Sequence, residues 1–228
     1  MKIKLVLFIF ILANAPHGLA VEPGHSETSK ARHSVATFAA GCFWCLETAF
    51  EGMTGVTSVV SGYMGGHLDN PTYEQVSRGI SGHAEVVQLT FDPKLVSYEL
   101  LLRVFWANVD PFTKNAQFCD RGSQYRSGIF FHDDAQALAA RRSQSEARAR
   151  LMAHHDTKKV PPFQVEITNA SRFYEAETYH QDYFKKQPQR YKRYRKGCRR
   201  DERLTEIWGK SEDGITLQQT THTPKKQD

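Results

Sequence analysis

Apolar residues recur along the chain with two periods, one of two positions and one of three to four, which indicates a mixture of strands and helices. Short apolar and β-branched runs predict strands at residues 35–40, 56–63, 86–91, 123–131 and 163–167. Amphipathic spacing predicts helices at residues 43–51, 134–153 and from the capping residue Ser97 to about Asp110. Weaker patterns predict a helical turn at residues 73–77 and an amphipathic segment at 176–186.

Residues 35–131 therefore follow the order β-α-β-β-α-β, which is the split βαβ arrangement. We expect an α+β protein: a two-layer α/β sandwich with a ferredoxin-like plait as its core and helices on one face of a mixed, antiparallel-rich sheet. A long polar loop is predicted at residues 112–122, and a basic linker is predicted before Gly197 and Cys198. One globular domain is expected at residues 34–209, including a C-terminal extension, followed by a disordered polar tail at 210–228.

The N-terminal stretch differs from the remainder of the chain. Lys2 and Lys4 precede an unbroken apolar run at residues 5–13, and small residues follow up to Ala20. This pattern is typical of a secretory signal peptide at residues 1–20 that is cleaved near Ala20. A membrane anchor is the alternative, but the run is shorter than the ~20 residues that span a bilayer. We expect an exported protein, periplasmic or secreted, with a flexible leader at residues 21–33 and no stable membrane anchor.

Positive charge is concentrated near the C-terminus. The 228 residues carry a formal net charge of +5, and Lys and Arg gather at residues 185–203 with tyrosines among them. Such a combination also occurs on nucleic-acid-binding surfaces. Because an exported protein is not expected to work on nucleic acid, we interpret the stretch as a solvated helix face and a basic rim around an active-site mouth.

The cysteines form two groups. Four cysteines in an exported protein usually indicate two structural disulfides. Here Cys42 and Cys45 form a C-x-x-C pair at a predicted helix start, whereas Cys119 and Cys198 lie far away, so a redox-active set is at least as well supported. A zinc site with four cysteine ligands would normally show a second close pair, and we expect no metal.

Cys42 lies where a predicted strand turns into a predicted helix. Unpaired N–H groups and the positive end of the helix macrodipole stabilise a thiolate at this position, so Cys42 is a candidate nucleophile. The alternative is a buried structural cysteine that is followed by two core aromatic residues, Phe43 and Trp44.

Three further side chains are candidates for acid chemistry. Glu85 is flanked by Ala84 and Val86 at the entrance of a predicted strand, where desolvation would raise its pKa into the range of a general acid. Tyr63 and Tyr125 lie at predicted strand ends, where a phenol donates a hydrogen bond to a substrate oxygen. The alternatives are a solvated glutamate and half-buried packing tyrosines.

Six short stretches, in order and at fitting intervals, resemble the peptide methionine sulfoxide reductase A family over roughly residues 35–208. They are Gly41-Cys42-Phe43-Trp44, Gly62-Tyr63-Met64-Gly65-Gly66, Asn70-Pro71-Thr72-Tyr73, Gly82-His83-Ala84-Glu85, Gln124-Tyr125-Arg126-Ser127 and Tyr179-His180-Gln181. The resemblance implies an oxidoreductase that reduces methionine S-sulfoxide, free or in proteins, and so repairs oxidised exported proteins.

The resemblance also implies site roles. The Cys42 thiolate would attack the sulfoxide sulfur while Glu85 donates a proton to the oxygen, which Tyr63 and Tyr125 hold. Phe43 and Trp44 would form an apolar wall for the S-methyl group. Supporting positions at the edge of the site would fall to Asp120 and His180.

Oxygen transfer leaves a sulfenic acid that a second thiol resolves into a disulfide. The family usually has glycine where this chain has Cys45, so Cys45 is one candidate for the resolving thiol. The resemblance favours Cys198, in a segment expected to be mobile, and Cys119 is a third candidate. No bound cofactor is implied; an external thioredoxin-like dithiol would restore the thiols, and we expect a monomer.

Two other classes of protein fit parts of the sequence. A thiol-disulfide oxidoreductase would use the Cys42/Cys45 pair, but its usual fold lacks the Gly-Tyr and His-Ala-Glu stretches. A non-catalytic binding module would lock all four cysteines in disulfides.

Overall fold

The structure is a computed structural model that describes residues 33–209 of the 228-residue chain. The predicted signal peptide at 1–20, nearly all of the leader at 21–33 and the predicted tail at 210–228 lie outside the described residues. Between residues 33 and 209, no helix is both long and apolar enough to cross a membrane.

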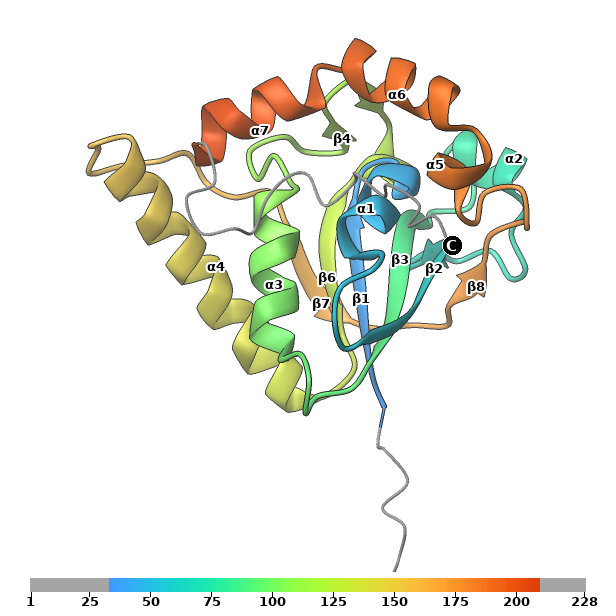
Figure 1. Ribbon diagram of the computed structural model, residues 1–228, viewed down its shortest axis with the longest axis horizontal. Coiled ribbons are helices and arrows are strands. Elements are labelled where there is room, and N and C mark those ends of the chain that lie inside the picture. Colours follow the sequence, from blue (N-terminus) through green and yellow to red (C-terminus); the bar gives the residue numbers. More distant parts are fainter. Residues whose placement is uncertain (1–32, 210–228) are drawn as a thin grey trace, which may run out of the picture. The chain divides into compact units, whose positions relative to one another are not determined.

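A six-stranded sheet runs through the domain in the order β7-β6-β1-β3-β2-β8 (Figure 1). Its strands are β1 (Ser34–Ala40), β2 (Val56–Met64), β3 (Ala84–Phe91), β6 (Ser127–Phe131), β7 (Glu166–Asn169) and β8 (Tyr174–Glu175). All neighbouring strands are antiparallel except β6 and β7, which are parallel. The expectation of a mixed α/β fold with a mixed, mostly antiparallel sheet is confirmed.

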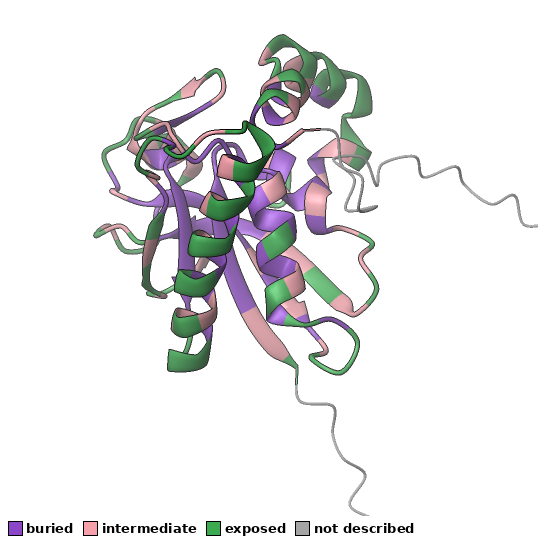
Figure 2. Ribbon diagram, turned by 90° about the vertical axis from the view of Figure 1, so that its left-hand side faces the viewer, coloured by how far each residue is buried: buried purple, intermediate pink, exposed green. Residues whose placement is uncertain are grey.

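Three helices pack with one face of this sheet: α1 (Phe43–Phe50), α3 (Tyr98–Ala107) and α4 (Asp134–His154). Alternate residues of β1 face them, and the Phe38 ring lies 5.4 Å from Phe50 of α1 and 5.3 Å from Phe105 of α3, centroid to centroid. Figure 2 shows the strands and the inner sides of these helices buried, with the outer faces of the helices exposed. This core fixes the strand-to-helix junction at which β1 gives way to α1.

Side-chain caps begin three helices, and the cap at Ser97 is the one that the sequence predicted. The Ser97 side chain accepts a hydrogen bond from the Leu100 N–H and so caps α3, and Asp133 caps α4 by accepting from the Gln136 N–H. The predicted turn at 73–77 is the short helix α2 (Tyr73–Ser77), where Thr72 and Gln75 satisfy each other's backbone groups in a capping box.

The predicted loop at 112–122 and the predicted strand at 123–131 are corrected by the structure. The first contains a two-stranded hairpin, β4 (Ala116–Gln117) and β5 (Asp120–Arg121), and the second begins with a 3-10 helix, η1 (Ser123–Tyr125). Gly122 has φ +129°, a conformation that ends β5 and turns the chain into η1. Tyr125 is therefore on a helical turn before β6, not at a strand end.

The C-terminal extension also differs from its prediction. The amphipathic segment at 176–186 is helical only in α5 (Tyr183–Lys186), and the predicted strand at 163–167 is displaced to β7. The predicted linker is the helix α6 (Pro188–Gly197), and α7 (Arg200–Trp208) follows. Pro188 is well placed in the first turn of α6, and Tyr191 packs with Cys45 and Tyr183, so tertiary contacts stabilise a helix that composition alone does not predict.

Candidate active site

Cys42 lies at the N-terminus of α1, directly after the turn that ends β1. The turn requires Gly41, which has φ +78°, and a Cβ there would come within 2.5 Å of the Gln117 Cβ. Cys42 itself is the N-cap of α1 and is only 6% exposed. The sequence-predicted junction is therefore present, but its sulfur is almost closed off from solvent.

Cys42 and Cys45 are free, buried thiols whose side chains are hydrogen-bonded to each other. Burial is the main cause that raises the pKa of Cys42 well above its ordinary value. The hydrogen bond from Cys42 is the main cause that lowers the pKa of Cys45 to about 6, and the nearby guanidinium of Arg200 favours the same charge. The two thiols therefore titrate as one coupled pair.

Burial of the Cys42 sulfur opposes the thiolate that is expected at the helix start. A helix terminus contributes only about 0.3–1 kcal/mol to a charged group, whereas removing a charge from water costs several kcal/mol. The acidic neighbours Glu85 and Asp120 raise the pKa of Cys42 further. Burial therefore outweighs the macrodipole.

Glu85 lies beside this pair. It is the second residue of β3, opposite Tyr63 in the register with β2, and is 2% exposed. Its Oε2 accepts a hydrogen bond of 3.1 Å from the backbone N–H of Phe43, the residue after Cys42. Burial raises the pKa of Glu85 to about 8 despite that hydrogen bond, so the carboxyl group is mostly protonated at neutral pH.

Asp120 closes the site from the β4–β5 hairpin. Its Oδ2 accepts a hydrogen bond of 2.5 Å from the hydroxyl of Tyr194 in α6, and its charge contributes to the raised pKa of Cys42. Burial raises the pKa of Asp120, while the Tyr194 hydroxyl and the Arg200 charge oppose the shift. The sequence did not single out Tyr194, because its segment was interpreted as a linker.

The tyrosines are arranged differently from the sequence prediction. Tyr63 is fully buried, and its hydroxyl donates to Glu177 Oε2 at 2.8 Å, so its proton is already used. Tyr125 and Tyr73 are half-buried. Burial is the main cause that raises the pKa of both phenols, that of Tyr73 to about 12, and the acidic groups of Glu85 and Cys42 add to the shift, so both phenols lie close to the site.

Besides Tyr194, the sequence did not single out Tyr73 and Glu177 as site residues. Glu177 joins the two tyrosine segments, because its other oxygen accepts a 2.8 Å hydrogen bond from the Tyr73 N–H. A signal for Tyr73 was present, since it follows Asn70-Pro71-Thr72 and begins a capped helix. Glu177 has no local signal, because its partners are more than 100 positions away in sequence.

Phe43 and Trp44 do form an aromatic wall. Phe43 is buried, and its ring centroid lies 4.9 Å from that of His180. Trp44 Nε1 donates to His180 Nδ1 at 3.1 Å, and the indole stacks on Tyr183 at 3.7 Å. Burial lowers the pKa of His180 to about 4, so the imidazole is neutral and orients the indole.

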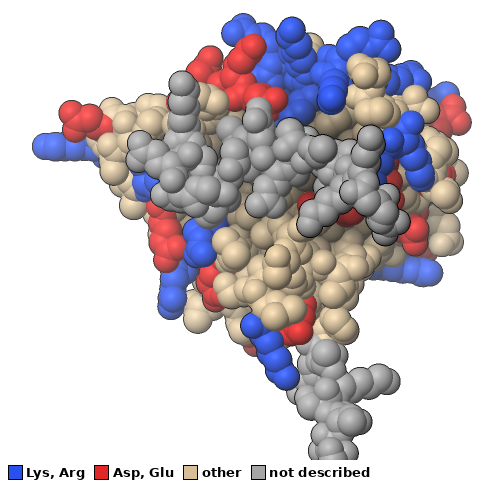
Figure 3. Space-filling view, viewed as in Figure 1, with Lys and Arg blue, Asp and Glu red and all other residues tan. Residues whose placement is uncertain are grey.

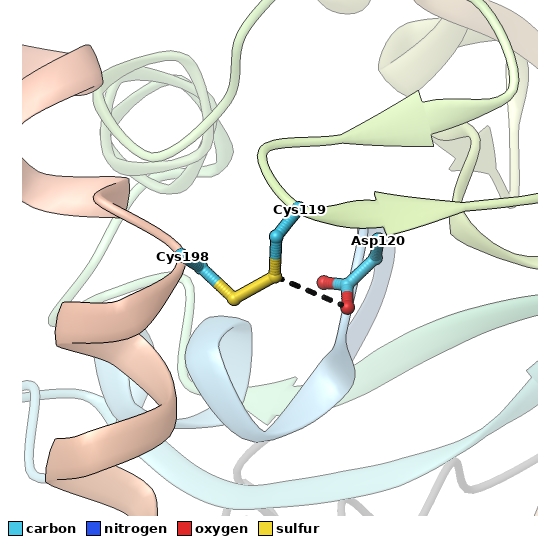
Figure 4. A group of neighbouring side chains, drawn as sticks. All are labelled: Cys119, Asp120 and Cys198. Atoms are coloured by element: carbon cyan, nitrogen blue, oxygen red, sulfur yellow. Dashed lines mark hydrogen bonds between the residues drawn. A yellow bond between two sulfur atoms is a disulfide. The ribbon is translucent and has the colours of Figure 1, made fainter.

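Cys119 and Cys198 form a disulfide, drawn in Figure 4, that joins the β4–β5 hairpin to the C-terminal end of α6. The Cys119 sulfur lies 3.7 Å from Asp120 Oδ1, so the bond borders the site without belonging to the Cys42/Cys45 pair. The expectation of a mobile Cys198 is wrong, because Cys198 caps α6 and is covalently held. A zinc site with four cysteine ligands does not fit either, because two of the four sulfurs are bonded to each other.

Comparison with known proteins gives a consistent result. A family model described as peptide methionine sulfoxide reductase matches residues 34–212. Peptide methionine sulfoxide reductase MsrA of Bacillus licheniformis is 44% identical over 80% of this chain and 97% of its own length, and its namesake from Bacillus subtilis is 46% identical over 78% and 97%. The crystal structure of reduced Mxr1 from Saccharomyces cerevisiae aligns with a TM-score of 0.62 at 31% identity, over 70% of this chain and 88% of Mxr1.

Proposed function

The chain belongs to the peptide methionine sulfoxide reductase family, and from this premise we propose that Cys42 is its attacking sulfur and Glu85 its general acid. The activity is the thiol-dependent reduction of methionine sulfoxide to methionine, so the protein is an oxidoreductase. One observation supports the assignment most directly. A buried, protonated carboxyl group is hydrogen-bonded to the residue that follows the buried cysteine.

The substrate is proposed to bind with its S-methyl group against Phe43 and Trp44, because thioether sulfur and methyl groups pack well on aromatic rings. The sulfoxide oxygen lies toward Glu85, with the hydroxyl groups of Tyr73 and Tyr125 as hydrogen-bond donors. Tyr73 takes the role that the sequence suggested for Tyr63, because the Tyr63 proton is donated to Glu177. Free and peptide-bound S-sulfoxides are the proposed substrates.

The chemical step transfers one oxygen atom. The Cys42 sulfur attacks the sulfoxide sulfur and gives its proton to Cys45, which the hydrogen bond already joins to it. Glu85 donates a proton to the oxygen, which passes to Cys42 as the sulfenic acid hydroxyl while the methionine thioether is released.

Cys45 is the proposed resolving thiol. Its sulfur attacks the Cys42 sulfenic acid, the hydroxyl leaves as water, and a Cys42–Cys45 disulfide forms. Cys198 was the stronger candidate on the resemblance, but its sulfur is bonded to Cys119. The side-chain contact between Cys42 and Cys45 supports Cys45 instead.

An external dithiol of the thioredoxin type is proposed to restore the pair, since thiol-disulfide exchange needs two electrons and no resident cofactor.

We also propose that the domain at 34–209 is exported, on the strength of the signal pattern at residues 1–20, and repairs oxidised exported proteins. The neighbouring antiparallel strands β6, β1, β3 and β2 support description of the core as a ferredoxin-like plait.

The test is direct. The purified chain is incubated with methionine sulfoxide and dithiothreitol, and methionine is measured by chromatography. We expect turnover that Cys42→Ser abolishes. Insulin reduction without sulfoxide reduction would instead support a thiol-disulfide oxidoreductase that uses the same two cysteines.

A further inference from the structure

The outer side of α6 carries a run of positive charge. We call Arg190, Lys192, Arg193 and Lys196 the basic face; all four are exposed, and α6 contains no acidic residue. Within residues 33–209 none of the four takes part in an ion pair. Figure 3 shows Lys and Arg gathered at the top of the molecule, where α6 lies in Figure 1.

Helix stability does not explain this face. Cations three and four positions apart repel one another, and a cation in the first turn opposes the macrodipole. Arg190 in the first turn and Arg193 one turn later are such a pair. The arrangement therefore suits an anionic partner.

The basic face ends at an accessible disulfide. Cys119 is exposed, and Cys198 lines a surface pocket of about 340 Å³. The charged residues of this pocket are of both signs: Arg121, Arg199 and Arg203, and Asp110, Glu202 and Glu206. Cys42 and Cys45, by contrast, are 6% and 1% exposed. A protein reductant can reach the first pair of sulfurs and not the second.

We propose that the basic face and the Cys119–Cys198 bond form the docking and exchange site for an acidic protein dithiol of the thioredoxin class. The inference rests on the proposed function, because it names the route by which reducing electrons enter. A ten-residue helix spans about 15 Å, which suits a protein surface better than a small thiol. An anionic membrane or a nucleic acid would use the charge but not the disulfide at its end.

Exchange occurs in two stages. The partner's thiolate attacks the Cys198 sulfur and releases Cys119 as a thiolate; the partner's second thiol then displaces Cys198, so the partner leaves oxidised by two electrons. Cys119 next attacks the sulfur of Cys42 in the Cys42–Cys45 disulfide, and Cys45 is released. Cys198 finally displaces Cys42 from Cys119, which restores the Cys119–Cys198 bond and leaves Cys42 and Cys45 reduced.

Asp120 places the two pairs next to each other. Its carboxylate lies 3.7 Å from the Cys119 sulfur and accepts a hydrogen bond from Tyr194, whose ring packs against Trp44, two residues after Cys42. The sulfur released in the first stage is therefore the one nearer to the active site.

The experiment compares two reductants, dithiothreitol and a bacterial thioredoxin of net negative charge, on the full chain. The variant Lys192→Gln/Arg193→Gln/Lys196→Gln is matched by Arg141→Gln/Arg142→Gln/Arg150→Gln on the exposed side of α4. In the α6 variant we expect the ratio of thioredoxin-driven to dithiothreitol-driven kcat/KM to fall about tenfold, and added salt should lower the ratio of the unsubstituted protein in the same way. The α4 variant should keep the ratio of the unsubstituted protein. Equal ratios in both variants would overturn the inference.

A trapping experiment locates the attacked sulfur. Thioredoxin whose second active-site cysteine is serine should accumulate a mixed disulfide, and peptide mass mapping should find it on Cys198. A mixed disulfide on Cys42 or Cys45 would overturn the route, as would binding of the basic face to phosphatidylglycerol vesicles with an unchanged thioredoxin ratio. No turnover of the unsubstituted chain with dithiothreitol would instead refute the proposed function.

Discussion

Cys42 and Cys45 lie within one helical turn, yet different charged groups surround them. Cys42 has the carboxyl groups of Glu85 and Asp120 nearby, and Cys45 has the guanidinium of Arg200. The sequence identified the nucleophile position but not this division, because Arg200 comes to the pair from 155 residues beyond Cys45 in a helix that composition did not predict.

The division predicts the behaviour of a single substitution. Cys42→Ala removes the hydrogen bond that is the main cause of the lowered pKa of Cys45. The pKa of Cys45 should rise from about 6 toward or beyond its ordinary value of ~8.5, because burial then dominates. Titration of the thiolate absorbance in the ultraviolet measures the pKa of Cys45 in this variant. A midpoint still near 6 would contradict the assignment of the lowered pKa to Cys42.

Glu85 sets the pH dependence of the reaction. Its pKa is raised to about 8, so the general acid is present below that pH and is lost as the pH rises through it. The kcat should fall above about pH 8 in the unsubstituted enzyme. Glu85→Gln should lower kcat about 10²-fold below pH 8 and remove this limb of the profile. A variant that keeps the alkaline fall would assign the limb to another group.

The tyrosines offer a matched pair of variants. Tyr73→Phe removes a hydroxyl that we assign to the substrate oxygen and should lower kcat about 10²-fold, the usual effect of one such donor. Tyr63→Phe removes a hydroxyl that is bound to Glu177 and should change kcat far less. Steady-state kinetics with methionine sulfoxide compare them, and the reverse order would restore the role that the sequence suggested.

At the scale of elements, local patterns predicted the regular parts of the fold. The strands β1, β2 and β3, the helices α1, α3 and α4, and the cap Ser97 all follow from short-range apolar spacing and capping chemistry. The elements that the sequence missed are stabilised by distant partners. The helix α6 depends on Tyr191 packing with Cys45, and β8 depends on pairing with Gly62 and Tyr63 of β2.

One buried carboxyl group joins two elements. Glu47 in α1 is 1% exposed; its Oε1 accepts a hydrogen bond from the Asp182 N–H before α5, and its Oε2 has no hydrogen-bond partner among residues 33–209. Burial raises its pKa to about 7, so the folded state holds this proton where the unfolded state, with a pKa of ~4.3, has lost it.

The sign of the resulting effect is fixed by linkage. The proton on Glu47 contributes about 3 kcal/mol to the free energy of unfolding below about pH 4, and this contribution is lost as the pH rises to 7. The free energy of unfolding of Glu47→Gln, measured with denaturant, is compared with that of the unsubstituted protein at pH 4 and at pH 8. The difference should shift in favour of the variant by about this amount between the two pH values. An equal difference at both pH values would show that Glu47 titrates normally.

At the scale of the molecule, the Cys119–Cys198 bond closes a loop of 79 residues that contains β6, α4 and β7. Replacing both cysteines by alanine should lower the free energy of unfolding by about 4 kcal/mol, from the regained freedom of the unfolded chain. Chemical denaturation measures it, with the unsubstituted protein in the absence of reductant as reference. An unchanged free energy would mean that the bond contributes to exchange alone.

Arg200 connects the end of the domain to its beginning. Arg200 is 1% exposed, and its guanidinium donates to two carbonyl groups. One belongs to Ala40, just before the Gly41 turn, and the other to Asn108, directly after α3. During synthesis on a ribosome, the first cysteines emerge some 155 residues before this cation does. A nascent chain therefore presents Cys42 and Cys45 as ordinary thiols to any oxidant or chaperone it meets, and acquires its reactive pair only after Arg200 has been synthesised and has folded back onto the Gly41 turn.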